Sequence, residues 1–366
     1  MKIAHLSSVH QRYDTRIFHK QCKTFVDNGD TVYLIVADGN GDELLSGVNI
    51  IDVGRPGGRV KRIFQTTKKV LQQALLLDCD VYQLHDPELI PIGLKLKRLG
   101  KRVVFDSHED VPKQLMSKPY LNRLTRWILS MSFSFYERLA CRKLDGVLTA
   151  TPTIREKFKH INCNVLDVNN FPLVGELNAH VPWGGKSKEV CYVGGITHIR
   201  GICEVIRSLS LTKSKTRLNL VGSFSEKNLQ EKVQAYDGWK FVDVHGQVNR
   251  EGVRDVLGAS VAGLVTFHPM PNHVDAQPNK MFEYMSAGIP VIASDFPMWR
   301  DIIEGSDCGL CVDPMNPQEI AEAIDFLVDN PSVAAEKGRN GHIAVMERYN
   351  WDIEAKKLLN FYAQLI

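Results

Sequence analysis

Two ionisable residues, Lys280 and Glu283, stand three positions apart at the start of a short helical pattern, Lys280–Ala287. Residues three apart share one face of a helix, so a cation and a carboxylate are presented together. A helix start above the end of a parallel sheet suits a ligand that carries both phosphate and hydroxyl groups. An ordinary surface ion pair on an amphipathic helix explains the same spacing.

The residues after this pattern predict how it is positioned. Gly288 and Pro290 end the helix, the first as a left-handed cap and the second because proline cannot continue a helix. The apolar run Val291–Ala293 is typical of a buried parallel strand. The segment therefore predicts a helix–turn–strand unit whose first turn faces a ligand.

Other polar residues also follow predicted strands. His85 comes after a strand at 80–84, and His108 comes after one at 102–105. The loops Ser7–Arg16 and Gly194–Arg200 follow strands as well. Because ligands bind at the carboxyl ends of parallel strands, these positions predict a single site.

The alternation of strands and helices predicts two doubly wound α/β halves. We expect an N-terminal domain at 1–172, a linker at 173–187, a C-terminal domain at 188–348 and a last helix at 349–366 that packs back toward the first domain. The expected strands of the two halves are 2–6, 31–36, 49–53, 80–84, 102–105, 146–150, 164–168, 189–193, 217–221, 239–242, 262–266, 291–293 and 308–312.

Composition is that of a globular protein, with 366 residues, 44% apolar and a net charge of +3, which does not favour nucleic acid. The N-terminus has no signal-peptide pattern, so we expect a cytoplasmic protein. The eight cysteines are then expected to be reduced. Cys308 and Cys311 form a lone CxxC, for which a core role is favoured over metal or redox chemistry.

Several segments in order resemble the retaining glycosyltransferases of family 4, which have the GT-B fold of two Rossmann-like domains facing a central cleft. These segments are SVHQRYDTRIFHKQ, VYQLHDPELIPIGLKLKRLGKRVVFDSHED, VCYVGGITHIRG, VHGQV and PNKMFEYMSAGIPVIASDFPMW. The resemblance covers essentially the whole chain. It implies that the C-terminal domain holds a nucleotide-sugar donor.

The resemblance assigns the ribose hydroxyls to Glu283, and the first acid of the family's paired-glutamate motif falls on Asp275, where glutamate is usual. In the diphosphate loop, Gly195 stands at the position of the family's arginine and Arg200 at that of its lysine. Lys280 is the candidate for the missing cation. The remaining donor-binding residues that the resemblance implies are Gly194, Thr197, Val244, His245, Gly246, Val248, Gln277, Pro278, Asn279 and Met281.

In the N-terminal domain the resemblance places His85 beside the reacting sugar. A neutral imidazole hydrogen-bonds a sugar hydroxyl and stabilises a developing oxocarbenium ion. His108 and Glu109 are candidates for acceptor positioning or for a structural role. Asp14 and Arg16 are candidates for acceptor binding or for organising the first loop. The implied catalytic residues are thus His85, Arg200, Lys280 and Glu283.

The resemblance implies transfer of a sugar, with retention, from a nucleotide-sugar donor to a glycan or polyprenyl-linked acceptor in bacterial surface-polysaccharide synthesis. A UDP-sugar is favoured over a GDP-sugar. We expect no metal and no cofactor, because Arg200 and Lys280 would neutralise the diphosphate. A nucleotide-sugar epimerase of the same architecture and a catalytically silent binding subunit remain alternatives.

Two segments of the N-terminal domain combine basic and aromatic or aliphatic residues, Lys61–Leu77 and Lys118–Arg142. Such faces suit the anionic inner leaflet of a membrane. A buried aromatic face with solvated basic residues opposite is the alternative. We therefore expect peripheral association with the inner face of the cell membrane.

Overall fold

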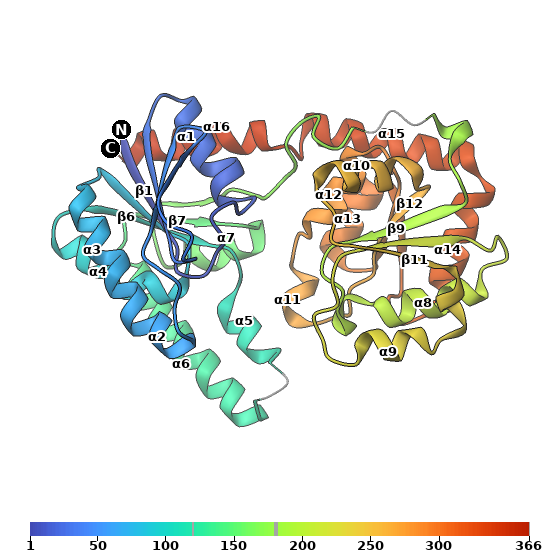
Figure 1. Cartoon of the computed structure of the whole chain (residues 1–366), viewed down its shortest axis with the longest axis horizontal. Coiled ribbons are helices and arrows are strands. Elements are labelled where there is room, and N and C mark those ends of the chain that lie inside the picture. Colours follow the sequence, from blue (N-terminus) through green and yellow to red (C-terminus); the bar gives the residue numbers. More distant parts are fainter. Residues whose placement is uncertain (119–120, 179–181, 366) are drawn as a thin grey trace. The chain divides into compact units, whose positions relative to one another are not determined.

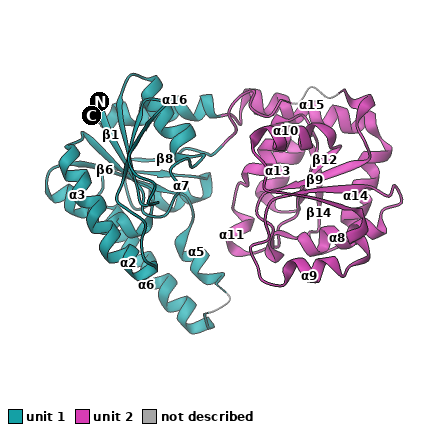
Figure 2. Cartoon of the chain, in the orientation of Figure 1, with its two compact units in different colours: residues 1–170, 351–366 teal, residues 171–350 magenta. Residues whose placement is uncertain are grey.

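The computed structural model describes residues 1–118, 121–178 and 182–365. It divides into two compact units, residues 1–170 with 351–366 and residues 171–350 (Figure 2). Each unit is an α/β domain built on its own sheet (Figure 1). The predicted fold class is confirmed.

Unit 1 contains an eight-stranded sheet in the order β3-β4-β2-β1-β5-β6-β7-β8. Every pair is parallel except β3 with β4. The short antiparallel strand β3 was not predicted. The strands are β1 (Lys2–Leu6), β2 (Thr31–Val36), β3 (Glu43–Leu45), β4 (Val48–Asp52), β5 (Val81–Leu84), β6 (Arg102–Ser107), β7 (Gly146–Thr149) and β8 (Val165–Asp167).

Helices cover this sheet because their apolar sides pack on its valine- and isoleucine-rich faces. A π-helical segment, Ile17–Cys22, precedes α1, and another, Arg62–Thr66, joins α2 to α3. The helices are α1 (Lys23–Asp27), α2 (Arg59–Lys61), α3 (Thr67–Leu77), α4 (Ile90–Arg98), α5 (Val111–Met116), α6 (Arg123–Cys141), α7 (Pro152–Lys159) and α16 (Trp351–Leu365).

Unit 2 contains a six-stranded, wholly parallel sheet in the order β11-β10-β9-β12-β13-β14. The strands are β9 (Glu189–Val193), β10 (Arg217–Val221), β11 (Val242–Gly246), β12 (Ala262–Val265), β13 (Val291–Ser294) and β14 (Gly309–Val312). The helices are α8 (Ile202–Leu211), α9 (Leu229–Gln234), α10 (Arg250–Ala259), α11 (Pro271–Val274), α12 (Asn279–Ser286), α13 (Pro297–Gly305), α14 (Pro317–Asp329) and α15 (Pro331–Glu347).

One predicted strand of unit 2, Trp239–Val242, was misplaced. Residues Asp237–Phe241 form a 3₁₀ helix, and the strand β11 begins at Val242. Gly238 explains the difference, because a Cβ atom there would lie 1.7 Å from the Ile206 carbonyl oxygen of α8. The segment is therefore pressed against a helix instead of lying in the sheet.

The boundary between the units lies at Asn170 and Phe171. The segment expected as a linker, 173–187, belongs to unit 2, and its residues 179–181 lie outside the described part of the chain. Phe171 and Leu177 explain this, because both are buried in the core of unit 2. The chain returns to unit 1 at Trp351, whose Nε1 donates to Thr24 Oγ1 at 2.9 Å.

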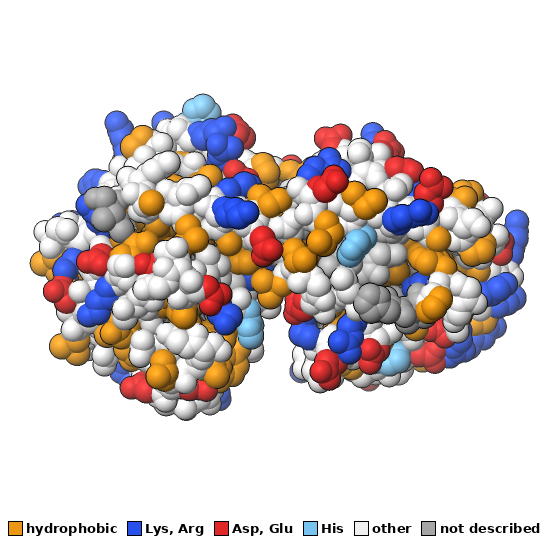
Figure 3. Space-filling model, turned by 90° about the horizontal axis from the view of Figure 1, so that it is seen from above, with side chains coloured by type: hydrophobic (Ala, Val, Ile, Leu, Met, Phe, Trp, Pro, Cys, Tyr) orange, Lys and Arg blue, Asp and Glu red, His pale blue; other side chains and the backbone are white. Residues whose placement is uncertain are grey.

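None of the described helices combines the length and the apolar character that crossing a bilayer requires. On the face of the molecule seen in Figure 3, basic and acidic side chains are intermixed on each unit.

Candidate functional site

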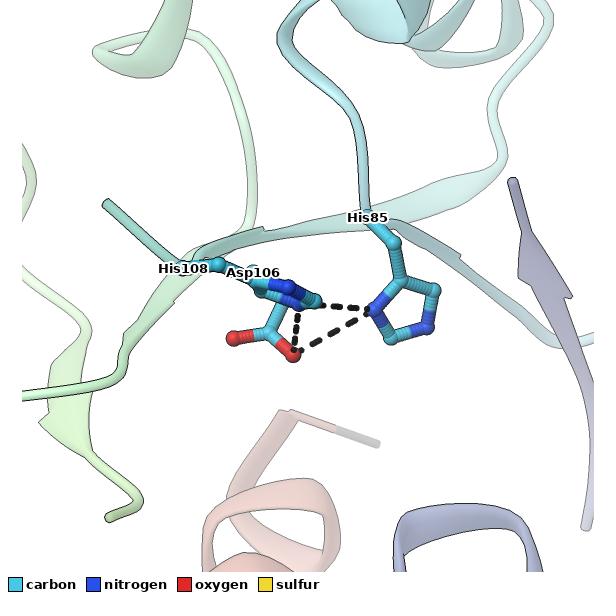
Figure 4. A group of neighbouring side chains, drawn as sticks. All are labelled: His85, Asp106 and His108. Carbon is cyan, nitrogen blue, oxygen red and sulfur yellow. Dashed lines mark hydrogen bonds and ion pairs between the residues drawn. The ribbon is translucent and has the colours of Figure 1, made fainter. Parts of the chain in front are cut away.

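Three side chains meet at the carboxyl ends of β5 and β6 in unit 1: His85, Asp106 and His108 (Figure 4). Asp106 Oδ2 lies 3.1 Å from His108 Nε2 and 3.3 Å from His85 Nδ1. Because β5 and β6 are adjacent and parallel, their ends bring residues 23 positions apart together.

Asp106 is the centre of this cluster. Its two oxygens accept hydrogen bonds from Arg16 Nε at 3.1 Å and Nη2 at 2.6 Å, and Oδ2 also accepts from Gln21 and Gln83. Burial alone would raise the pKa of Asp106, but Arg16 and His108 lower it well below its usual value. The carboxyl group is therefore a permanent anion that aligns the donors around it.

This donor arrangement resembles a metal site, because three possible ligand atoms lie within 4.8 Å of one another. The Arg16 guanidinium already supplies the positive charge next to Asp106, and Oδ2 is occupied by two amide donors. These residues fit an arginine-neutralised carboxylate better than a cation ligand.

Both ring nitrogens of His85 have close polar neighbours. Nε2 lies 3.0 Å from His5 Nδ1, and Nδ1 lies 3.3 Å from both Asp106 Oδ2 and His108 Nε2. The other nitrogen of His5, Nε2, is buried and has no hydrogen-bond partner in the described part of the chain. Burial lowers the pKa of His85 to about 4, against the opposing charge of Asp106, so the ring is neutral.

Exposure separates the members of the cluster. The His85 side chain is 0% exposed and both its nitrogens are engaged, whereas that of His108 is 18% exposed and that of His10 is 27% exposed. The ring centres of His10 and His108 are 4.8 Å apart. The predicted direct contact of His85 with a sugar is not available in this conformation, and His108 and His10 present the accessible imidazoles.

The predicted residues of the first loop organise it. Asp14 Oδ1 accepts from the backbone N–H groups of Arg16 and Ile17, both at 2.9 Å, and Asp14 Oδ2 lies 3.5 Å from His10 Nδ1. Burial would raise the pKa of Asp14, but the bond to His10 lowers it below its usual value. Arg16 is 4% exposed and donates to Asp106, so its role is to hold that carboxylate in place.

Glu109 lies outside the histidine cluster. Its carboxylate accepts a hydrogen bond from Gln114 of α5. Ser107 Oγ donates to the Glu109 carbonyl at 3.2 Å. This arrangement supports the structural role that was one of its two predicted roles.

In unit 2, the loop after β9 ends at Gly201, which lies against the backbone just after β12 with no room for a side chain. Gly194 and Gly201 have φ angles of 114° and 79°, in the region that favours glycine. A Cβ atom on Gly201 would lie 1.9 Å from the Thr266 carbonyl oxygen. The loop backbone therefore approaches the end of the sheet closely, as a phosphate cradle does.

Lys280 enters this region from the first turn of α12. Its Nζ lies 3.6 Å from the centre of the Tyr192 ring and 5.5 Å from that of Phe267. The residue is 7% exposed, and burial, followed by repulsion from Arg200, lowers the pKa of its amine well below the usual value. The amine is held by ring faces and has no hydrogen-bond partner in the described part of the chain.

Arg200 lies beside Lys280 and uses the space that Gly195 leaves. Arg200 Nη1 donates to the Gly195 carbonyl at 3.2 Å, and a Cβ atom on Gly195 would lie 2.8 Å from that nitrogen. Its guanidinium also lies 5.5 Å from the centre of the Phe267 ring. The glycine that replaces the family's arginine thus admits the guanidinium of Arg200.

Other buried polar atoms here also lack a partner in the described ranges: Thr197 Oγ1, Thr266 Oγ1 and Gln277 Oε1. Thr197 belongs to the loop, and Thr266 contacts it through Gly201. Buried polar atoms are nearly always satisfied. Two hydroxyls, an amide oxygen and an amine left unsatisfied indicate a site that a polar ligand completes.

Glu283 pairs with a residue that sequence reasoning missed. Arg250, at the start of α10, donates from Nη1 to Glu283 Oε1 at 2.8 Å and from Nε and Nη2 to Glu176 at 2.7 and 2.9 Å. Burial would lower the pKa of Arg250, but the two carboxylates raise it above its usual value. Glu283 keeps Oε2 for another donor.

The remaining predicted donor residues differ in availability. Val244 and Val248 are exposed, and His245 Nε2 lies 2.9 Å from Asn219 Oδ1. Val244, His245 and Gly246 belong to the edge strand β11, and only Val248 lies beyond it. Met281 is fully buried in the core, so its side chain does not face a ligand.

The segment before α12 is held at Ala276, whose N–H donates to the His273 carbonyl at 3.0 Å. Trp299 Nε1 donates to the Ala276 carbonyl at 2.6 Å, between Asp275 and Gln277. Pro278 and Asn279 then begin the helix. Asp275 follows α11 directly, as its C-cap residue.

The CxxC cysteines do not join either group. Cys308 and Cys311 are free, and burial raises the pKa of both thiols to about 12. Thiolates are needed for metal binding and exchange chemistry. The expected core role is thus the one that their surroundings support.

Solved structures with two domains of this kind match the chain along its full length. Sucrose-phosphate synthase of Thermosynechococcus elongatus is 18% identical, with a TM-score of 0.79 over 100% of this chain and 98% of that chain. HepE of Anabaena, solved with UDP-glucose, is 13% identical, with a TM-score of 0.74 over 100% of both chains. The fold is therefore the GT-B fold.

Two family models match successive parts of the chain. Residues 15–165 match the model described as Glycosyltransferase Family 4, and residues 176–343 match Glycosyl transferases group 1. The chain belongs to this glycosyltransferase family, as its motifs predicted.

Curated relatives match a shorter stretch. A protein of Methanocaldococcus jannaschii described as an uncharacterized glycosyltransferase is 26% identical over 48% of this chain. The capsular polysaccharide biosynthesis glycosyltransferase CapM of Staphylococcus aureus is 24% identical over 47% of it. The matched region spans 44% of the length of each relative.

Proposed function

We propose that the chain transfers a sugar, with retention, from a nucleotide-sugar donor to a glycan or lipid-linked glycan acceptor, with a UDP-sugar favoured. The observation that carries this proposal is the set of unsatisfied buried polar atoms in unit 2, on the loop after β9, just after β12 and at the start of α12. The similar HepE structures, which contain UDP, UDP with glucose or UDP-glucose, support a uridine donor.

The donor's diphosphate binds between the loop after β9 and the first turn of α12. Lys280 and Arg200 neutralise it, Thr197 and Thr266 donate their hydroxyls, and Glu283 Oε2 accepts from the ribose. The Lys280 amine is desolvated and lies on ring faces. An approaching anion therefore stabilises its charged form more strongly than it would stabilise a solvated amine. No metal is needed in this scheme, because two side chains supply the positive charge.

Transfer breaks the bond between the anomeric carbon and the diphosphate oxygen. The acceptor oxygen forms its bond on the same face of the sugar, which retains the configuration. The leaving diphosphate takes the acceptor proton, and Lys280 and Arg200 stabilise the negative charge that develops on it.

Unit 1 offers its own polar groups for sugar and acceptor hydroxyls. His108 is the imidazole that touches the sugar, and His85 positions it through Asp106. His10, between Asp14 and Asp86, is a polar contact for the acceptor, because it lies 3.5 and 3.4 Å from their carboxylates and is accessible. Asp14 and Arg16 then support acceptor binding indirectly.

We further propose that helix α6 associates with the inner face of the cell membrane, where surface polysaccharides are assembled. Five apolar residues at helical spacing along one side of α6 are all exposed: Leu124, Ile128, Met131, Phe135 and Leu139. Exposed Arg123, Arg138 and Arg142 accompany them. The match to CapM supports a role in polysaccharide synthesis.

Binding and turnover of nucleotide sugars test the function. UDP, UDP-sugars, GDP and GDP-sugars are titrated calorimetrically, and slow donor hydrolysis and transfer to glycan acceptors are followed by mass spectrometry. We expect UDP binding that Glu283→Ala weakens and transfer that His108→Ala suppresses. Absence of binding to every nucleotide would refute the proposal. If a stereocentre of the donor sugar were inverted without any acceptor, the epimerase alternative would replace this proposal.

A further inference from the structure

The last helix of the chain reaches the histidine cluster through one hydroxyl group. Tyr362 of α16 is fully buried and donates a hydrogen bond to Gln83 Oε1 in the middle of β5. Gln83 Nε2 in turn donates to Asp106 Oδ2 at 3.2 Å and to Gln21 Oε1 at 2.6 Å. In Figure 4 the end of α16 lies beside the cluster.

The direction of every proton in this chain of bonds is determined. Ionised Asp106 only accepts, so both glutamines must turn their amide nitrogens toward it. Gln83 Oε1 then faces Tyr362, whose hydroxyl must donate. Gln21 Oε1 accepts from Gln83, and Gln21 Nε2 donates to Asp106 at 2.8 Å.

We propose that Tyr362 is a positioning residue for the His108–Asp106 pair and acts through Gln83. Removing the hydroxyl leaves Gln83 Oε1 buried without its donor. The amide then gains by turning its oxygen elsewhere, and Asp106 loses one of the donors that share its charge. The proposal rests on the proposed function for the role of His108 in catalysis, but not for the network itself.

Helix α16 follows unit 2 in sequence but belongs to unit 1, where its Tyr362 joins the network. α16 is held at its start by Trp351 and Glu354, whose carboxylate accepts from the Asn169 N–H at 2.8 Å. Those contacts place Tyr362 opposite Gln83. A chain lacking α16 would therefore keep His85, Asp106 and His108 but would lose the Tyr362 hydroxyl that donates to Gln83.

The test compares Tyr362→Phe with Tyr82→Phe in the full-length protein. Tyr82 is a matched control, because its buried hydroxyl donates to the Ala74 carbonyl at 2.9 Å and it neighbours Gln83 on the opposite face of the sheet. Proton NMR of the imidazole N–H groups follows the network directly. Steady-state kinetics across pH follow its effect on turnover.

We expect Tyr362→Phe to move the ring N–H resonances bonded to Asp106 downfield, because fewer donors share that carboxylate. We expect kcat to fall about three- to tenfold and the acidic limb of its pH profile to shift, with the donor KM unchanged. Tyr82→Phe should do none of this. In a Gln83→Leu background, Tyr362→Phe should add nothing further.

Ring resonances and a pH profile that match those of Tyr82→Phe would overturn the proposal. So would additive effects in the Gln83→Leu background. Because the resonances need no turnover, a failure of the proposed activity with an altered spectrum would leave the network intact and refute only the proposed function.

Discussion

Lys280 and Glu283 share one face of α12 but do not pair with each other. Glu283 accepts from Arg250 Nη1 at 2.8 Å, whereas Lys280 Nζ lies 3.6 Å from the Tyr192 ring centre. A surface ion pair, one of the two interpretations of their spacing, is therefore excluded. Lys280 Nζ has no hydrogen-bond partner in the described part of the chain, and Arg250 engages only Oε1 of Glu283. Both side chains can therefore bind a ligand.

Substitution Lys280→Met separates binding from stability. The buried amine lacks a hydrogen-bond partner in the described part of the chain, so we expect the free energy of unfolding to change by less than about 1 kcal/mol or to rise. UDP affinity should fall about 100-fold. Calorimetry and urea unfolding measure the two quantities.

Lys186→Met is the control for this substitution. Lys186 Nζ donates to the carbonyls of Gly258 and Ser260 at 2.6 and 2.8 Å, so its loss should cost about 1–3 kcal/mol of stability without affecting UDP. Equal loss of stability in both variants would contradict the view that Lys280 awaits a ligand.

The lowered pKa of Lys280 predicts proton uptake on donor binding. Burial disfavours the charged form of the amine in the free protein, and a bound diphosphate favours it. Calorimetric titrations of UDP in buffers of different ionisation enthalpy should therefore report net proton uptake at pH 8. Proton uptake that persists in Lys280→Met would show that another group takes up the proton.

Arg250→Leu tests how Glu283 recognises ribose. Loss of the guanidinium frees the Glu283 carboxylate and removes its link to Glu176. We expect UDP to bind about tenfold more weakly and a 2′,3′-dideoxy analogue to bind as in the wild type. Glu283→Gln should reproduce this pattern, and an equal loss for both nucleotides would argue against a ribose role.

The histidine cluster predicts how stability depends on pH. The folded protein holds His85 neutral down to about pH 4, whereas its pKa in the unfolded chain is 6.5. Protonation therefore favours the unfolded state as pH falls through this window, by up to about 3 kcal/mol. Urea unfolding at pH 7 and pH 5 should show a smaller loss in His85→Gln than in the wild type.

The exposed histidine at 160 provides the control, since His160→Gln should leave the pH dependence unchanged. His5 is also buried and its pKa is lowered, so some dependence should remain in His85→Gln. An unchanged slope in that variant would contradict the assignment of a neutral His85.

Helix α6 predicts binding to anionic bilayers. Phe135→Asp places a charge in the exposed apolar stripe, and we expect it to reduce sedimentation with phosphatidylglycerol vesicles about tenfold. Phe326→Asp, an exposed phenylalanine of α14, is the matched control. Vesicle binding that is equal in the two variants would remove α6 as the membrane contact.

The local sequence determined most of the fold. Strands β1, β2, β9 and β10 lie at their predicted residues, because short, mostly apolar runs buried on both faces leave little choice. The motifs also pointed to Lys280, Glu283, His85 and His108 as candidates, since each lies at a strand end or a helix start; their roles stay predictions. Short helices such as α5 and α11, and the long helix α15, were not predicted.

Only the tertiary structure decided what these residues contact. Tyr362 and Gln83 are 279 positions apart, and no local pattern brings them together. The same holds for Arg250 with Glu283 and for His5 with His85. Hydrogen-bond partners and burial depend on distant segments that meet when the sheets form, whereas strand and helix periodicity depends on neighbours in the chain. The chemistry of the two groups of residues was therefore settled by packing.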